Sequence, residues 1–201
     1  MTSSKRFTYS EPTISAKKSD ETNNFVWIAY EQDTDNNCNI KKLYGFDLDQ
    51  VFFSIDKSVD KIVDIDVDGT NVYLAYEDST LLGEILDQGT PVATTTDISM
   101  PSGITITEFP VAIVVNGTDL YFLLPGSASS TNAKILKYNT DGIFQDEIDL
   151  TKSGATVTNA TSLTVDANND IWVVTNNSPA EYVRVQQLSG GIFDFTIFET
   201  T

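Results

Sequence analysis

The sequence contains no histidine and a single cysteine, Cys38, among its 201 residues. Without histidine, Cys/His zinc sites and nucleophiles activated by an imidazole base are excluded. Cys38 forms no intramolecular disulfide, and its asparagine-rich surroundings, with no basic residue before Lys41 and Lys42, do not activate a thiol. The motifs G-x-S-x-G, S-x-x-K and CxxC and a glycine-rich phosphate loop are also missing. We therefore expect no catalytic residue, no metal ligand and no cofactor.

Positive charge and long apolar runs are scarce as well. The chain has 12 basic against 29 acidic residues, a net charge of -17, and its arginines are Arg6 and Arg184. This charge excludes a nucleic-acid or anionic-membrane surface and favours protein partners. The densest apolar clusters, residues 111–115 and 120–124, are far shorter than the roughly 18 residues that a membrane span requires. Residues 1–10 show no signal-peptide pattern, so we expect synthesis in a cytoplasm, with a virion as one destination.

An apolar run centred on an aromatic residue recurs four times along the chain. Residues 26–31 (VWIAYE) match residues 72–77 (VYLAYE) almost residue for residue, and further copies lie at 120–124 and 171–175. The central aromatics, which we call the marker aromatics, are Trp27, Tyr73, Tyr121 and Trp172, at intervals of 46, 48 and 51 residues. Regular spacing of this kind indicates a repeat architecture.

Each repeat has the pattern of four antiparallel strands. Polar turns rich in Asn, Asp and Gly precede the runs, at residues 20–24, 68–71, 116–119 and 166–170, and further strand candidates stand on both sides. The run itself is apolar at consecutive positions, which predicts a strand that is buried on both faces. No helical periodicity is sustained over three turns. Repeats of 40 to 50 residues with four strands indicate an all-β fold, a small β-propeller of four four-stranded antiparallel blades.

The expected organisation is an N-terminal arm, residues 1–11, and one propeller domain, residues 12–201. Its blades are expected at approximately residues 12–60, 61–108, 109–155 and 156–201. Since propellers have four to eight blades, four units either close into a small ring or form an arc that a partner chain completes. Phe7, Thr8 and Tyr9 in the arm alternate like a strand. They are candidate interaction residues, which either add a strand to the last blade or augment a partner's sheet, unless the arm is disordered.

One repeat carries a recognisable signature. The segment Asp166-Ala-Asn-Asn-Asp-Ile-Trp-Val-Val-Thr175 resembles the D-x-x-G-x-I/L-W-V/I-x-T signature of NHL-like and regulator-type propellers, with Asn169 at the glycine position. The segment from Asp66 to Leu74 is a looser copy. Propellers of this type include lyases, lactonases, ligand sensors and structural scaffolds, so the resemblance implies an architecture and no particular activity.

The acidic clusters do not form a convincing chemical site. Asp64-Ile-Asp-Val-Asp-Gly69 begins like an EF-hand loop, but the twelfth position, which must supply a bidentate Glu, is Ala75. We expect Asp64 and Asp66 to face the channel or solvent, before a hairpin turn at Asp68-Gly69. Many other carboxylates are present, and no pair stands out for acid–base chemistry. The marker aromatics are interpreted as packing between blades, because a ligand rarely needs the same group in every repeat.

These features favour a non-enzymatic structural or interaction protein. We expect it to act as a rigid platform in a larger assembly, with a homo-oligomer as one form of that assembly. Its composition is similar to that of accessory proteins of virus or phage particles, such as capsid decoration, tail or fibre components. One alternative is an enzyme or ligand sensor that uses Asp64, Asp66 and Asp166 in the central channel. Another is a carbohydrate-binding module that uses aromatics outside the repeat positions, such as Tyr9 or Phe53.

Overall fold

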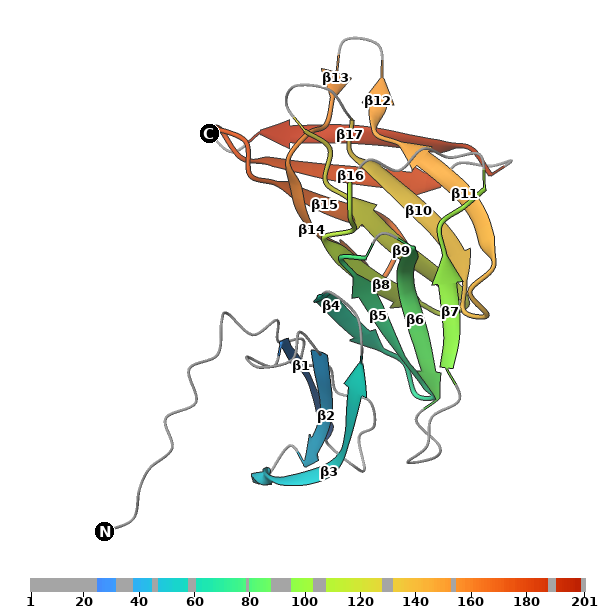
Figure 1. Ribbon diagram of the computed structural model, residues 1–201. Helices are drawn as coiled ribbons and strands as arrows, with labels where there is room; N and C mark the ends of the chain where they lie inside the picture. Colours follow the sequence, from blue (N-terminus) through green and yellow to red (C-terminus); the bar gives the residue numbers. More distant parts are fainter. Residues whose placement is uncertain are drawn as a thin grey trace.

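The structure is a computed structural model that describes most of the chain from residue 25 onward. The described residues are 25–31, 38–44, 47–57, 61–78, 80–87, 95–102, 108–127, 132–152, 155–187 and 191–199. They form strands and turns, and no helix capable of crossing a membrane occurs among them. The predicted all-β fold is confirmed (Figure 1).

The described residues form four consecutive antiparallel sheets of three or four strands, and a separate two-stranded sheet, β12–β13. The first sheet contains β1 (Phe25–Glu31), β2 (Cys38–Tyr44) and β3 (Asp47–Lys57); the second contains β4 (Ile62–Val67), β5 (Asn71–Tyr76), β6 (Leu81–Asp87) and β7 (Thr95–Ser99). The third contains β8 (Ala112–Asn116), β9 (Asp119–Leu124), β10 (Lys134–Asn139) and β11 (Phe144–Asp149); the fourth contains β14 (Ala160–Val165), β15 (Ile171–Thr175), β16 (Glu181–Gln187) and β17 (Phe193–Glu199). In each sheet, strands that are neighbours in sequence are paired, as the repeat pattern predicts.

One part of the sequence-based prediction lies outside the described residues, and another differs from the structure. The expected first strand of the first repeat, residues 13–16, and the arm with Phe7, Thr8 and Tyr9 lie outside the described residues. The polar sequence of segment 151–161 predicts a long loop, but the segment contains the hairpin of β12 (Thr151–Lys152) and β13 (Ala155–Thr156) and the first residues of β14. Its polar sequence concealed these short strands, because backbone pairing there does not depend on apolar side chains.

Among the described residues, the hydrophobic core consists of three clusters, each between two consecutive sheets. One joins the first and second sheets, one the second and third, and one the third and fourth. In β5, every residue from Val72 to Tyr76 is buried, and in β9 every residue from Leu120 to Leu124 is buried. Alternate residues of these strands belong to different clusters. The expectation that the marker strands are buried on both faces is therefore confirmed in the second and third sheets.

The sheets are arranged as an arc of propeller blades. Their first strands β4, β8 and β14 contact one another in succession along the inner side of the arc. The first and fourth sheets lie at opposite ends of the series (Figure 1), and no core cluster of the described residues joins them. Of the two expected arrangements, the described residues therefore form an arc, with an uncovered sheet at its end.

The turn before β15 explains the glycine missing from the signature. Asn169 has a positive φ of 64°, in the left-handed region. Asparagine enters this region more easily than most side chains, so it replaces the usual glycine without changing the turn. In the hairpin between β8 and β9, the left-handed position at φ 62° is occupied by Gly117. Asn116 pairs with Asp119 across the β8–β9 turn, whereas Val165 pairs with Ile171 across the longer β14–β15 turn, so the two left-handed residues belong to different turns.

Candidate functional site

The acidic residues of β4 hold two sheets together. Asp64 accepts hydrogen bonds from the backbone N–H groups of Ile65 at 2.8 Å and Ile113 at 2.9 Å. Asp66 repeats this pattern with the N–H groups of Val67 and Val115, both at 2.8 Å. Of the two expected surroundings, solvent is wrong for Asp66, which is 7% exposed, and one oxygen of each carboxylate is bonded to β8 of the next sheet.

This arrangement has a physical reason. β8 is the edge strand of the third sheet, so its outward N–H groups have no neighbouring strand to bind. Asp64 and Asp66 supply the missing acceptors from the second sheet. Burial raises the pKa of the Asp64 carboxyl above its usual value, while its two backbone hydrogen bonds oppose that effect. The pair therefore connects blades, and its oxygens are occupied by backbone donors.

A second group of carboxylates organises the hairpin turns and positions the marker aromatics. Asp166 accepts N–H groups of Asn168 and Asp170 through Oδ1, and its Oδ2 accepts the indole N–H of Trp172 at 3.0 Å. The bond from Trp172 is the main reason why the pKa of Asp166 lies below its usual value. Asp166 occupies the first position of the signature, and its physical role is to shape the turn and to hold the marker tryptophan.

The second sheet uses the same device. Asp68 accepts the N–H groups of Thr70 and Asn71 through Oδ1, and its Oδ2 accepts the Tyr73 hydroxyl at 2.7 Å. This link between turn and aromatic was not predicted from the sequence. An Asp five or six residues before a marker Tyr or Trp is the signal that reveals it.

The marker aromatics occupy equivalent positions, but their surroundings differ. Trp27 lies in the cluster between the first and second sheets, Tyr73 in the next cluster, and Tyr121 in the cluster between the third and fourth sheets. In each case the aromatic points toward the following sheet. Trp172 points the same way from the fourth sheet, where the described chain has no further blade, and it is only partly buried. The marker aromatic is thus partly exposed in the fourth repeat, whereas it is buried in the first three repeats.

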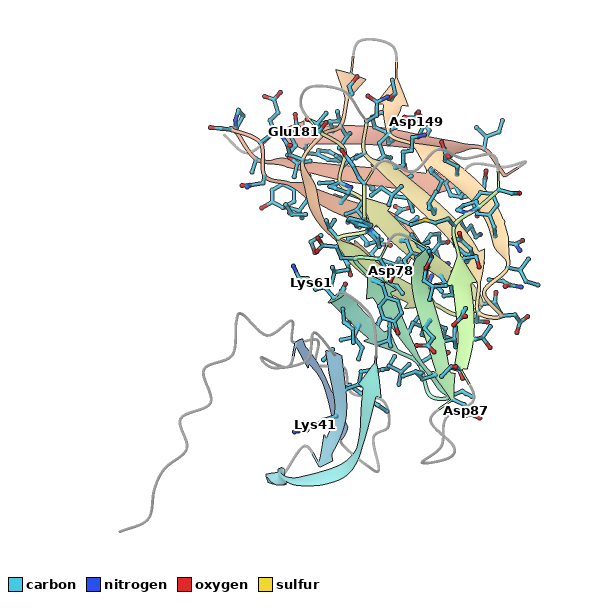
Figure 2. All side chains as sticks on the ribbon, viewed as in Figure 1. Lys41, Lys61, Asp78, Asp87, Asp149 and Glu181 are labelled. Atoms are coloured by element: carbon cyan, nitrogen blue, oxygen red, sulfur yellow. The ribbon has the colours of Figure 1, made fainter. Side chains whose placement is uncertain are left out.

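We call this surface the end face and define it by Trp172, Val174, Tyr182, Arg184 and Phe198. Backbone pairing aligns Trp172 with Arg184, Val174 with Tyr182, and Tyr182 with Phe198 across β15, β16 and β17. Tyr182 is 44% and Phe198 43% exposed. The end face is therefore continuous over three strands. In Figure 2, the label of Glu181 marks the end of the arc that carries this face, and the label of Lys41 marks the first sheet at the other end.

Aromatic and cationic groups are ordered on the end face. The rings of Trp172 and Phe198 stack with centroids 5.9 Å apart and an angle of 28° between their planes. The Arg184 guanidinium carbon lies 5.9 Å from the Trp172 ring centroid, within the range of a cation–π contact. Arg184 donates through Nη2 to Gln186, and its buried Nε lies 3.9 Å from Asp170 Oδ2 in an ion pair. These contacts hold the side chains of the end face in place.

An open hollow of about 550 Å³ is a separate surface feature. It lies where β4 and β8 begin, is lined by Phe109, Pro110 and Pro125 among others, and is flanked by the Lys61–Glu77 ion pair at 3.4 Å. No sequence pattern predicted this hollow. Within the described ranges, no group of three potential His, Cys, Asp or Glu ligands lies close enough to hold a metal ion.

Comparison with known proteins adds information on the fold. No protein-family model matches the sequence, and no curated protein matches it significantly. Among solved structures, a eukaryotic initiation factor aligns with a TM-score of 0.54 and 10% identity, over 96% of this chain and 43% of the other. The WD40 domain of SCAP from fission yeast aligns with a TM-score of 0.52 and 11% identity, over 94% and 52%. A tail fibre of Staphylococcus aureus phage P68 aligns with a TM-score of 0.37 and 10% identity, over 94% and 51%.

These likenesses concern architecture, since the identities are near 10%. Together with the four consecutive sheets, they place the chain among β-propeller folds. The chain spans about half the length of the solved structures that it matches. Its arc therefore follows part of a propeller of that size.

Proposed function

We propose that this protein is a non-enzymatic interaction platform in a larger assembly and that the end face is its principal contact surface. The observation that carries this proposal is the position of Trp172, which is equivalent to three buried aromatics and yet is uncovered. A strand that is apolar at consecutive positions gains its full stabilisation only when both faces leave water. A partner that covers the end face supplies the missing burial.

The composition of the end face also supports a protein partner. Trp, Tyr and Arg are the residues most enriched among the energetic centres of protein interfaces. Trp172, Tyr182 and Arg184 lie together at the paired centre of this sheet. The stacking of Trp172 on Phe198 and the cation–π contact of Arg184 with Trp172 fix these three side chains before binding, which reduces the conformational entropy lost on association.

The proposed absence of enzymatic activity is supported by the bonds that the candidate carboxylates already make. Asp64 and Asp66 each accept two backbone N–H groups, and Asp166 accepts two turn N–H groups and one indole N–H. A general base must approach a substrate proton within hydrogen-bond distance. Using these oxygens for catalysis would require breaking bonds that hold the blades and turns.

We further propose that the assembly is a virus or phage particle, with this protein as a capsid decoration, tail or fibre component. The support is compositional: no histidine, one cysteine and a net charge of -17 in a β-rich chain. The link between Asp166 and Trp172 supports, in addition, blades of the NHL-like or regulator type.

The test is isolation of the tagged protein from its source under gentle conditions, followed by mass photometry and sedimentation with particles. We expect complexes far above the monomer mass of 22.1 kDa, and their loss in a Tyr182→Glu variant. Ile143→Glu is the matched control, because Ile143 is 59% exposed in a turn of the third sheet, away from the end face. A monomer in every fraction would contradict the platform function. Complexes without virus particles would contradict only the virion assignment.

A further inference from the structure

The three sheet interfaces inside the chain follow one rule. The face of each sheet that carries its marker aromatic, here called the forward face, packs on the opposite, or back, face of the following sheet. Tyr121 and Leu123 on the forward face of β9 share a cluster with Ile171 and Val173 on the back face of β15. The same relation joins the first sheet to the second and the second to the third. The structure thus contains three examples of one interface.

The end face is the forward half of a fourth such interface. In β15, Ile171 and Val173 are buried against the third sheet, whereas Trp172 and Val174, which alternate with them, are only partly buried. By the rule of the preceding interfaces, the complementary surface is the back face of another propeller sheet. The end face continues an established series of contacts.

The first sheet is the matching candidate. The β1 sequence is apolar at consecutive positions, Val-Trp-Ile-Ala-Tyr from residue 26 to residue 30, as are the sequences of β5 and β9. In β5 and β9 this pattern accompanies burial on both faces. Trp27 and Ala29 lie in the cluster toward the second sheet. A sheet packed behind β1 would complete the pattern, and the fourth sheet of another copy offers the corresponding forward face.

Two copies of four blades have a natural closure. Contacts that join different surfaces of identical subunits form a ring when the rotation between copies closes, and two copies then share a two-fold axis along the ring channel. Eight blades is within the size range of propellers. The arc aligns with 43% and 52% of the two solved propeller-type chains, so its curvature suits a ring of about twice its own length.

We propose that a second copy of this chain covers the end face with its first sheet, and that two copies form a closed ring of eight blades. This inference rests on the proposed platform function and names its first partner. Both interfaces of the ring are equivalent, so a single substitution on the end face weakens two contacts at once. Closure also leaves no unpaired forward face on which a filament could grow.

The test uses the purified full chain alone, in sedimentation equilibrium and in size-exclusion chromatography with light scattering, over a wide concentration range. We expect a species of twice 22.1 kDa, and particle images along the ring axis with eight blades. Tyr182→Glu and Phe198→Glu place charges on exposed positions of the end face and should raise the dimer dissociation constant by roughly 30-fold or more. Ile143→Glu should leave it unchanged, and circular dichroism melts should show that all three variants fold.

Several results would overturn the inference. These are a monomer at every concentration, open oligomers that lengthen with concentration, or a dimer insensitive to both end-face variants. A chain that is monomeric when pure but enters a Tyr182-dependent complex at its source would refute the second copy and leave the platform function standing. A chain that is monomeric in both settings would refute both proposals.

Discussion

The variant Asp66→Asn tests whether the carboxylates of β4 hold the second and third sheets together. Asp66 is 7% exposed, and both of its oxygens accept backbone N–H groups, from Val67 and Val115, at 2.8 Å. Asparagine has nearly the same shape, but one of its terminal groups is an NH₂ donor. In either orientation the amide therefore directs a donor at a backbone N–H, which loses its acceptor.

The expected destabilisation follows from these bonds. A hydrogen bond to a charged group contributes about 1.5–3 kcal/mol, and one to a neutral group about 0.5–1.5 kcal/mol. Asp66→Asn loses one charged bond and weakens the other, while the smaller desolvation penalty of the amide offsets part of the loss. We expect a decrease of roughly 2–3 kcal/mol in the free energy of unfolding. For a chain of this size, that corresponds to a Tm lower by about 4–12 °C.

The assay is urea unfolding with matched thermal melts. The control is Asp97→Asn, because Asp97 lies exposed on β7, and its substitution should change stability by no more than about 0.5 kcal/mol. The urea m-value should remain unchanged, since the same surface unfolds. If Asp66→Asn were as stable as Asp97→Asn, the assignment of Asp66 as a connection between blades would be refuted.

Two further predictions concern packing and pH. Gly83→Ala should lower stability by about 3 kcal/mol, because the added Cβ would lie 2.0 Å from the backbone oxygen of Leu74, whereas Gly69→Ala, with no atom within 4 Å, should stay within about 1 kcal/mol of wild type. Equal urea midpoints for the two variants would contradict this steric argument. Asp166 has a lowered pKa because of Trp172, so its contribution to stability is present above about pH 4 and is lost as the pH falls through the folded-state pKa. Urea midpoints between about pH 5 and pH 2 should therefore fall less in Asp166→Asn than in wild type, and an equal fall would contradict the assignment.

The strands and their repeat are encoded locally, which is why the sequence predicted them well. The runs 120–124 and 171–175 were expected as strands and lie in β9 and β15. Apolar patterns and turn residues act over a few positions, so they can be read without knowledge of distant contacts. The same local pattern gave the all-β class and the four units. It failed at β12 and β13, where a short hairpin forms from polar residues.

The roles of the acidic residues and of the end face depend on tertiary structure. Asp64 and Asp66 bind backbone groups 49 residues away, and no local pattern encodes the alignment of two sheets. Likewise, Trp172 has the same sequence environment as its buried counterparts, and only the arrangement of the blades leaves it uncovered. Sequence by itself determined which strand faces are apolar. The fold decided which of those faces is covered, because burial depends on whether a neighbouring sheet is present.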